Sequence, residues 1–162
     1  MHHKTNQLFT IGQTADAFSV GDIIQHATSK TIYESDNNLF SLLTMNHHPI
    51  HTNADYAKGQ RHGQELVVGT LVLSLIVGMT VPEISGKALA NLGYDKVRHL
   101  GPTFTGDTLY CRSEVLEITP SSNGNTAVLK VKTFGFNQNG ADIISFERDV
   151  LLPVKAREGS DA

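Results

Sequence analysis

The most apolar stretch of the chain spans residues 66–80, and its pattern differs from that of a surface helix. A surface helix carries one apolar stripe, whereas this segment is apolar nearly all round. It is also shorter than the roughly 20 apolar residues that a membrane-spanning helix needs. The pattern therefore predicts a helix that protein surrounds on most sides, and Pro82 and Gly86 are expected to break it.

The chain after residue 88 has the pattern of β-strands. Residues 89–97 are expected to form a strand, and 108–118, 126–136 and 143–152 alternate apolar and polar positions with a period of two. The stretches 122–125 and 137–140 predict two hairpin connections. One polar residue, Arg148, falls on the apolar face of the last predicted strand.

The first third of the chain predicts shorter elements. The polar stretch 16–22 leads into a predicted strand over 23–32. A helix is expected to start at Ser35 or Asp36 as its N-cap, because the apolar positions 39, 40, 42 and 43 recur at helical spacing. Pro49 is expected to stop that helix. Residues 53–58 predict another short helix or turn, 59–63 a loop, and 156–162 a frayed tail.

One buried helix followed by a run of antiparallel strands predicts an α+β fold, the hotdog architecture, in which a sheet curls around the helix. We expect a single domain over residues 1–162, with a core of about 16–154. A small sheet covers only one face of its helix and leaves a long strand edge open. A homodimer or higher homo-oligomer is therefore expected.

Composition excludes several classes of protein. The chain has 162 residues, with 13 basic against 16 acidic side chains and a net charge of -3, so a broad nucleic-acid-binding surface is not expected. The one cysteine, Cys111, excludes an intramolecular disulfide and a cysteine-rich zinc module. Residues 1–10 lack the apolar run of a signal peptide. We expect a cytoplasmic protein that binds neither membrane nor nucleic acid.

The segment 44–51 contains three histidines, His47, His48 and His51, after a predicted helix. Loops held between rigid elements often carry catalytic groups. A metal site is not expected, because Pro49 keeps His47 and His51 off one helical face. Nucleophilic catalysis also has little support. Ser74 lacks a GxSxG elbow and Cys111 lies in a predicted strand without an evident partner.

Gly69 lies near the start of the predicted buried helix, where backbone N–H groups have no partner within the helix. A glycine at this point would let a ligand carbonyl approach those donors closely. Alternatively, Gly69 and Gly78 would only let the sheet pack tightly against the helix. The local sequence leaves both interpretations open.

Several short motifs follow one another in a specific order along most of the chain. In that order they are Phe18-Ser19-Val20-Gly21-Asp22, Asp36, Asn46 with Pro49-Ile50-His51, Asn53 with Tyr56-Ala57, Val68-Gly69 with Leu73-Ser74-Leu75, and Pro102-Thr103-Phe104-Thr105-Gly106-Asp107. With this set the chain resembles the MaoC-like dehydratases, or R-specific enoyl-CoA hydratases, whose hotdog domains act on acyl-CoA thioesters. The resemblance runs from residue 18 to residue 152.

The resemblance implies roles for three residues. The family's catalytic loop reads D-x-N-P-x-H, so His51 takes the position of the catalytic histidine and Ser74 that of a supporting helix serine. Asn46 replaces the aspartate, and His48 replaces the asparagine. An amide orients water through its oxygen but does not act as a base at neutral pH.

A narrower resemblance, to the mesaconyl-CoA hydratase or β-methylmalyl-CoA dehydratase branch, accounts for Asn46, because that branch also has asparagine there. The residues that carry it are Leu43-Thr44-Met45-Asn46, Pro49-Ile50-His51, Ala57-Lys58-Gly59, Arg61, Gly63-Gln64, Ala90-Asn91-Leu92-Gly93 and Val97-Arg98. It implies reversible hydration of a 2-enoyl-CoA with a short branched dicarboxylic acyl group. It implies no cofactor, since CoA is part of the substrate.

The resemblance also suggests where the substrate binds. Gly69 and Thr70 are expected to bind the thioester carbonyl, and Arg61, Arg98 and Asn91 the acyl carboxylate or CoA, although either arginine could be an ordinary surface charge. Two alternatives stay open. Asn46 would also fit a non-catalytic acyl-CoA-binding protein, and an acid beside the helix, Glu65, would fit a hotdog thioesterase.

Overall fold

The computed structural model describes residues 11–155. The 156–162 tail predicted to fray lies outside that range. The described elements, in chain order, are a 3-10 turn Ala15–Ala17, β1 Ile23–Gln25, β2 Lys30–Thr31, α1 Glu34–Leu43, α2 Ala54–Lys58, α3 Gly69–Met79, a π-helical turn Val81–Ser85, β3 Ala90–His99, β4 Thr108–Pro120, β5 Thr126–Phe136 and β6 Asp142–Pro153.

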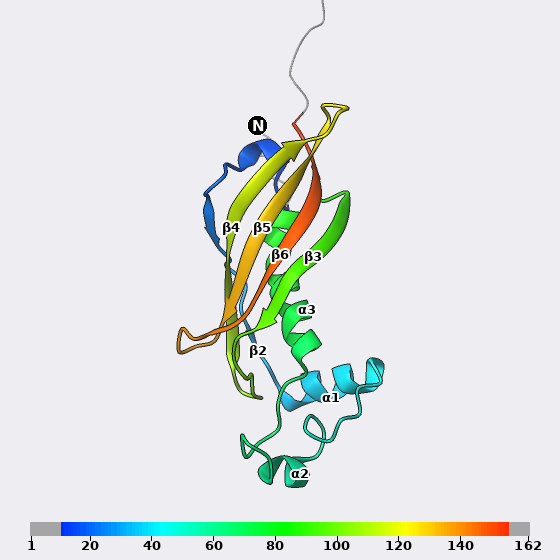
Figure 1. Ribbon diagram of the computed structural model, residues 1–162, viewed down its shortest axis with the longest axis vertical. Helices are drawn as coiled ribbons and strands as arrows, with labels where there is room; N and C mark the ends of the chain where they lie inside the picture. The colour runs from blue at the N-terminus through cyan, green and yellow to red at the C-terminus, as the bar shows by residue number, and fades with distance from the viewer. Residues whose placement is uncertain (1–10, 156–162) are drawn as a thin grey trace, which may run out of the picture.

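The strands form one antiparallel sheet in the order β1-β4-β5-β6-β3, and β2 pairs with β4 beside β1. Long hairpins join β4 to β5 and β5 to β6 at the two turns predicted from the sequence. The sheet curves around α3, which lies along one of its faces (Figure 1). This arrangement confirms the predicted α+β hotdog fold.

The core lies between α3 and the sheet. Apolar side chains of α3, including Val72 and Ile76, pack with Ile144 and Phe146 of β6, and all four are at most 2% exposed. Gly135 of β5 lets the two layers approach closely, because a Cβ there would lie 2.7 Å from the side chain of Ile76. A second buried cluster lies under the other end of the sheet.

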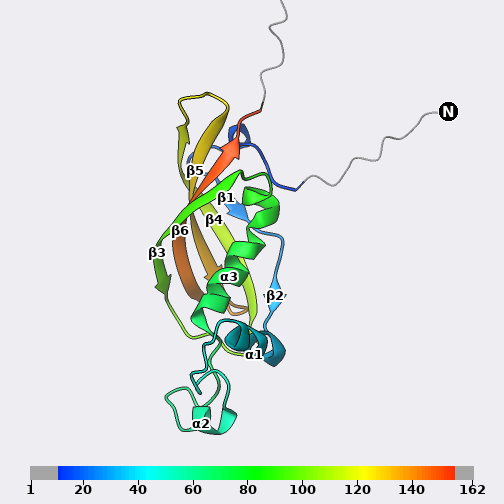
Figure 2. The same cartoon turned by 90° about the vertical axis from the view of Figure 1, so that its right-hand side faces the viewer.

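Within residues 11–155, no other element covers the face of α3 that points away from the sheet (Figure 2). Thr70, Ser74 and Gly78 recur every four residues along that face and are exposed. Gly78 has no neighbour within 4 Å of a Cβ built on it, so tight packing on the sheet does not explain this glycine. In the described part of the chain, the sheet therefore covers α3 on one side only.

The predicted strand over 23–32 is wrong in its middle, where residues 26–29 separate β1 from β2. The His26 N–H still donates to the Cys111 carbonyl of β4 at 3.2 Å, but the pairing ends there. At this point the Glu83 carboxylate accepts hydrogen bonds from the ring of His26 and the backbone N–H of Ala27.

Both predicted helix ends also need correction. Helix α1 ends at Leu43 instead of at Pro49, and Met45 follows in the left-handed conformation with φ 59°. Its N-cap is Tyr33, and Asp36 accepts a hydrogen bond from the Tyr33 N–H. Pro82 does not break the helical path after α3, because it lies at the start of the π-helical turn, where a missing N–H is tolerated.

No helix in residues 11–155 combines the length and the apolar character needed to cross a membrane.

Candidate active site

The histidine-rich loop lies between α1 and α2, beyond the sheet, at the end where α3 begins (Figures 1 and 2). The half-buried His51 connects this loop to the segment that leads into α3, since its Nδ1 lies 2.9 Å from the carbonyl oxygen of Leu66. A carbonyl can only accept, so Nδ1 carries the hydrogen in this contact. The other ring nitrogen, Nε2, is then left with a lone pair to accept a proton.

Asn46 belongs to the same loop and is also half-buried. Its backbone N–H donates to the Ser41 carbonyl at 3.0 Å, which anchors the loop to the end of α1. Its side-chain oxygen has one long contact, 3.5 Å to the N–H of His48. The structure thus places Asn46 and His51 on one loop without a hydrogen bond between their side chains.

His48 supports the fold of this loop. Its ring meets the rings of His51 and Tyr56 edge-on, each with a 6.2 Å separation of centroids, and its Nδ1 accepts from the N–H of Ile50 at 3.1 Å. No three His, Cys, Asp or Glu side chains in residues 11–155 come together in a group that could hold a metal ion.

The first turn of α3 supplies free donors beside this loop. The N–H groups of Leu71 and Val72 both bond to the carbonyl of Val68. The preceding two, on Gly69 and Thr70, have no acceptor in the described part of the chain. Such N–H groups favour a negatively charged or strongly polarised oxygen. The binding of a thioester carbonyl here stays a prediction.

His99, at the end of β3, lies against the first turn of α3, and no motif in the sequence indicated this contact. A Cβ added to Gly69 would come within 2.9 Å of Cε1 and 3.0 Å of Nε2 of the His99 ring. Gly69 therefore makes room for a side chain of the sheet. A second imidazole in addition to His51 thus lies at the start of α3.

A buried amide in α1, Asn37, was also missed. It is 2% exposed and hydrogen-bonds to the His51 backbone and to the Leu66–Val68 segment. The helical spacing predicted that Asn37 lies in this helix. It did not predict that Asn37 is buried while its neighbour Asn38 is exposed.

Ser74, on the second turn of α3, donates its hydroxyl to the carbonyl of Thr70 at 2.8 Å. This bond to the preceding turn is common for serine in helices. The hydroxyl makes no hydrogen bond to Asn46 or His51 in residues 11–155, so a direct supporting contact stays a prediction.

The residues proposed for CoA or the acyl carboxylate are not brought together. Arg61 is exposed in the loop after α2. Arg98 pairs with Ser145 on the outer face of the sheet, beside a hollow of about 250 Å³ that Lys96 and Lys132 also line. Asn91 lies about 25 Å from His99 along β3. Their roles stay predictions.

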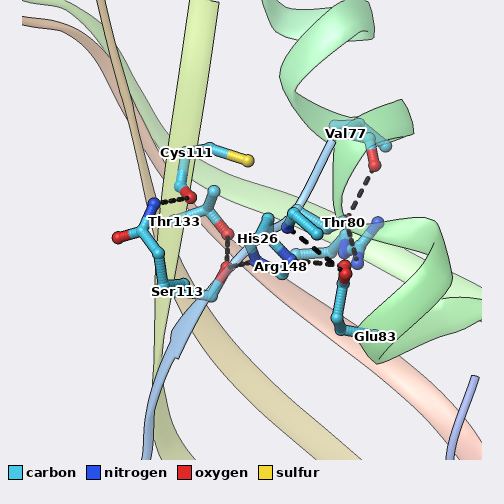
Figure 3. A network of polar contacts seen from close by, with 10 residues as sticks. His26, Val77, Thr80, Glu83, Cys111, Ser113, Thr133 and Arg148 are labelled. Atoms are coloured by element: carbon cyan, nitrogen blue, oxygen red, sulfur yellow. Dashed lines mark hydrogen bonds and ion pairs between the residues drawn. The ribbon is translucent and has the colours of Figure 1, made fainter. Parts of the chain in front are cut away.

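A separate buried polar network lies at the other end of α3 (Figure 3). His26 contacts Glu83 through Nδ1 and Ser113 through Nε2, both at 2.8 Å, and Ser113 shares a 2.8 Å hydrogen bond with Thr133. Burial lowers the pKa of His26, although the Glu83 carboxylate opposes that shift. The order serine, histidine, carboxylate resembles a hydrolytic triad, but Ser113 is 1% exposed, so a substrate cannot reach it.

Comparison with known proteins agrees with this architecture. The family model described as "MaoC like domain" matches residues 17–138. Over 92% of its own length, this chain is 34% identical to a mesaconyl-CoA hydratase of Cereibacter sphaeroides. Over 94% of its own length, it is 32% identical to a β-methylmalyl-CoA dehydratase of Chloroflexus aurantiacus. It covers only 42% of each of these relatives.

A solved structure of a MaoC domain protein from Chloroflexus aurantiacus superposes with a TM-score of 0.87 at 30% identity. The superposition covers 98% of this chain and 44% of the chain in the solved structure. The chain therefore belongs to the MaoC-like domain family, as the ordered motifs indicated.

Proposed function

We propose that the protein catalyses the reversible addition of water to the double bond of a 2-enoyl-CoA thioester. The observation that supports this most is the contact between His51 Nδ1 and the Leu66 carbonyl. It places a proton-accepting imidazole on the segment that leads directly into the free amides of α3. The mesaconyl-CoA hydratase and β-methylmalyl-CoA dehydratase among the relatives catalyse a reaction of this class by name.

In the proposed reaction, the N–H groups of Gly69 and Thr70 hold the thioester oxygen. Negative charge builds up on that oxygen as water attacks the β-carbon, and one such donor is typically worth about 3 kcal/mol of barrier. His51 takes a proton from the water through Nε2 and a proton is returned to the α-carbon. Asn46 orients the water through its side-chain oxygen. Ser74 supports the first turn through its bond to Thr70.

We propose a short branched dicarboxylic acyl group such as mesaconyl, because the names of two relatives point to it. Arg61 is the candidate to bind the free carboxylate, since a guanidinium makes two parallel charge-assisted bonds to such a group. Addition of water moves no electrons to an acceptor, so the reaction proposed here requires no redox cofactor. We propose that the N–H groups of Gly69 and Thr70 stabilise the thioester oxygen without a metal ion.

We further propose that the protein acts in the cytoplasm as a homo-oligomer, at least a dimer. The exposed face of α3 and the open edge of β3 support the homo-oligomer, because a second copy would cover both.

Incubation of the protein with crotonyl-, mesaconyl- and itaconyl-CoA tests the proposal through the loss of enoyl absorbance. We expect hydration, fastest with mesaconyl-CoA, and a larger loss on mesaconyl-CoA than on crotonyl-CoA in Arg61→Ala. Release of free thiol without hydration would indicate a thioesterase instead, and binding without turnover a non-catalytic acyl-CoA-binding protein.

His51→Ala tests the catalytic assignment, with His47→Ala as the matched control from the exposed part of the same loop. We expect kcat to fall about 100-fold or more for His51→Ala, as is usual for general acid–base groups, and to stay near wild type for the control. Equal rates in the two variants would remove His51 from the mechanism.

A further inference from the structure

The side chain of Asn37 is buried where three segments meet. From α1 it donates through Nδ2 to the carbonyl oxygens of His51, at 3.0 Å, and Leu66, at 3.2 Å. Its Oδ1 accepts from the N–H of Val68 at 2.9 Å. Both amide hydrogens and the amide oxygen are therefore used, on the histidine loop and on the segment that enters α3.

An asparagine is well suited to this position. Two carbonyls and one N–H converge on it in a site that is 2% exposed, so a partner must offer two donors and one acceptor within a few ångströms. An apolar residue would leave the His51 carbonyl and the Val68 N–H without a partner, and the Leu66 carbonyl would keep only its bond to the His51 ring. Asparagine is also a weak helix former compared with leucine or alanine, so its place in α1 is not explained by helix propensity.

Asn37 holds His51 at two points. It binds the backbone carbonyl of His51, and it shares the Leu66 carbonyl that receives the hydrogen of His51 Nδ1. The two lone pairs of that carbonyl are thus occupied by the catalytic imidazole and by Asn37. The backbone and the ring of His51 are both fixed relative to α1.

The same side chain holds the start of α3. Val68 is the N-cap residue of α3, and the free N–H groups of Gly69 and Thr70 follow it directly. One amide therefore connects the group proposed to move the proton with the groups proposed to hold the thioester oxygen. A shift of about 1 Å between such groups can lower a rate by about 100-fold.

We propose that Asn37 is a positioning residue that fixes His51 relative to the amides at the start of α3. This inference rests on the proposed hydration. Asn37 touches neither water nor substrate in this proposal, and its effect on the reaction passes through His51 and Val68.

Two substitutions separate its contacts. Asn37→Asp keeps an acceptor for the Val68 N–H and loses both donors, whereas Asn37→Ser is shorter and leaves room for a water. Asn38→Ser is the matched control, because Asn38 is the exposed neighbour in the same helix. We expect kcat for mesaconyl-CoA to fall 10- to 100-fold in both Asn37 variants, with KM changed less than threefold and no change in the control.

Nitrogen-15 NMR of the histidine rings gives a readout that does not depend on turnover, with the His51 signal assigned through His51→Gln. In the wild type we expect the tautomer that carries hydrogen on Nδ1. In Asn37→Asp we expect a mixture of tautomers, while hydrogen exchange of the Val68 amide stays slow. The unfolding free energy of each variant is measured in parallel. If one Asn37 variant does not fold, the kcat and the His51 tautomer of the other variant test the proposal.

The outcomes separate this proposal from the proposed function. An unchanged His51 tautomer together with kcat equal to that of Asn38→Ser would overturn the role of Asn37. A changed tautomer with an unchanged kcat would also overturn it, while the hydratase assignment would stand. If the wild type hydrates no enoyl-CoA, the hydratase assignment fails, and the NMR result still decides whether Asn37 fixes His51.

Discussion

Gly69 and His99 form a close contact at the point where the thioester oxygen is proposed to bind. Two explanations of Gly69 are therefore open, room for the His99 ring and room for a ligand. A methyl group at position 69 interferes with either, so a single substitution does not separate them.

A double-mutant cycle on Gly69→Ala and His99→Ala distinguishes the two explanations. We expect Gly69→Ala to lower the unfolding free energy by about 1–3 kcal/mol, as overpacking does, and the double variant to recover most of that loss. The rate of hydration should stay at least tenfold low in the double variant, because the methyl still covers the amide. Full recovery of both quantities would mean that Gly69 only accommodates His99.

At the scale of single residues, the sequence motifs predicted that His51 and Asn46 belong to one loop. This was possible because the two residues lie close together in the sequence and match the catalytic loop motif of the family. Asn37 and His99 could not be predicted in this way. Their importance comes from contacts between α1 and the histidine loop, and between β3 and α3. Neither contact has a signature in the local pattern.

Among the elements, the turn after α3 is tied to the sheet by the network around His26 (Figure 3). Glu83 on this turn faces the His26 ring, Ser113 of β4 faces it from the other side, and Cys111 lies on the same strand. The Arg148 guanidinium of β6 donates to Thr80 at 2.9 Å, and its positive charge also lowers the pKa of His26.

This network predicts a pH dependence of stability. Because the folded state lowers the pKa of His26 below its ordinary value of 6.5, the unfolded chain binds a proton more readily. The contribution of neutral His26 is present above a pH of about 6.5 and is lost as the pH falls from there towards the lower folded pKa. Urea titrations between about pH 7 and pH 5 should show a smaller loss for His26→Gln than for wild type.

The control for this prediction is His47→Gln, because His47 is exposed in the histidine loop. It should keep the full pH dependence of the wild type. A pH dependence that is the same in His26→Gln and in wild type would contradict the prediction.

At the scale of elements, the patterns placed β4, β5 and β6 to within two residues, because apolar and polar residues alternate along all three strands. In β4 and β5 the burial alternates as well, whereas residues 143–148 of β6 are all buried. Arg148, the exception in the last strand, points into the core and is 2% exposed. The break between β1 and β2 was missed because the local pattern has no sign of the contacts that His26 and Ala27 make with Glu83, a residue far along the chain.

At the scale of the whole molecule, β3 lies at the edge of the sheet and pairs only with β6 among residues 11–155. Leu92 and Tyr94 on this strand are 55% and 42% exposed, and a bulge near Lys96, with φ 50°, interrupts its pairing with β6. Exposed edges with large apolar residues favour pairing with another chain.

Light scattering after size exclusion tests this pairing. We expect the wild type to have at least twice the monomer mass of 17.6 kDa, and Leu92→Lys to shift it towards the monomer. Ile23→Lys is the control, since Ile23 is 65% exposed on β1 at the opposite edge. A monomeric wild type, or equal masses in the two variants, would exclude β3 as the contact.

The position of Cys111 has a practical consequence for such measurements. This thiol is 0% exposed on β4, and burial raises its pKa to about 12. Only the thiolate reacts readily with alkylating reagents. A cysteine introduced on the surface can therefore be coupled selectively to a fluorophore or spin label while the natural one stays in place, so distance measurements between chains require no cysteine-free background.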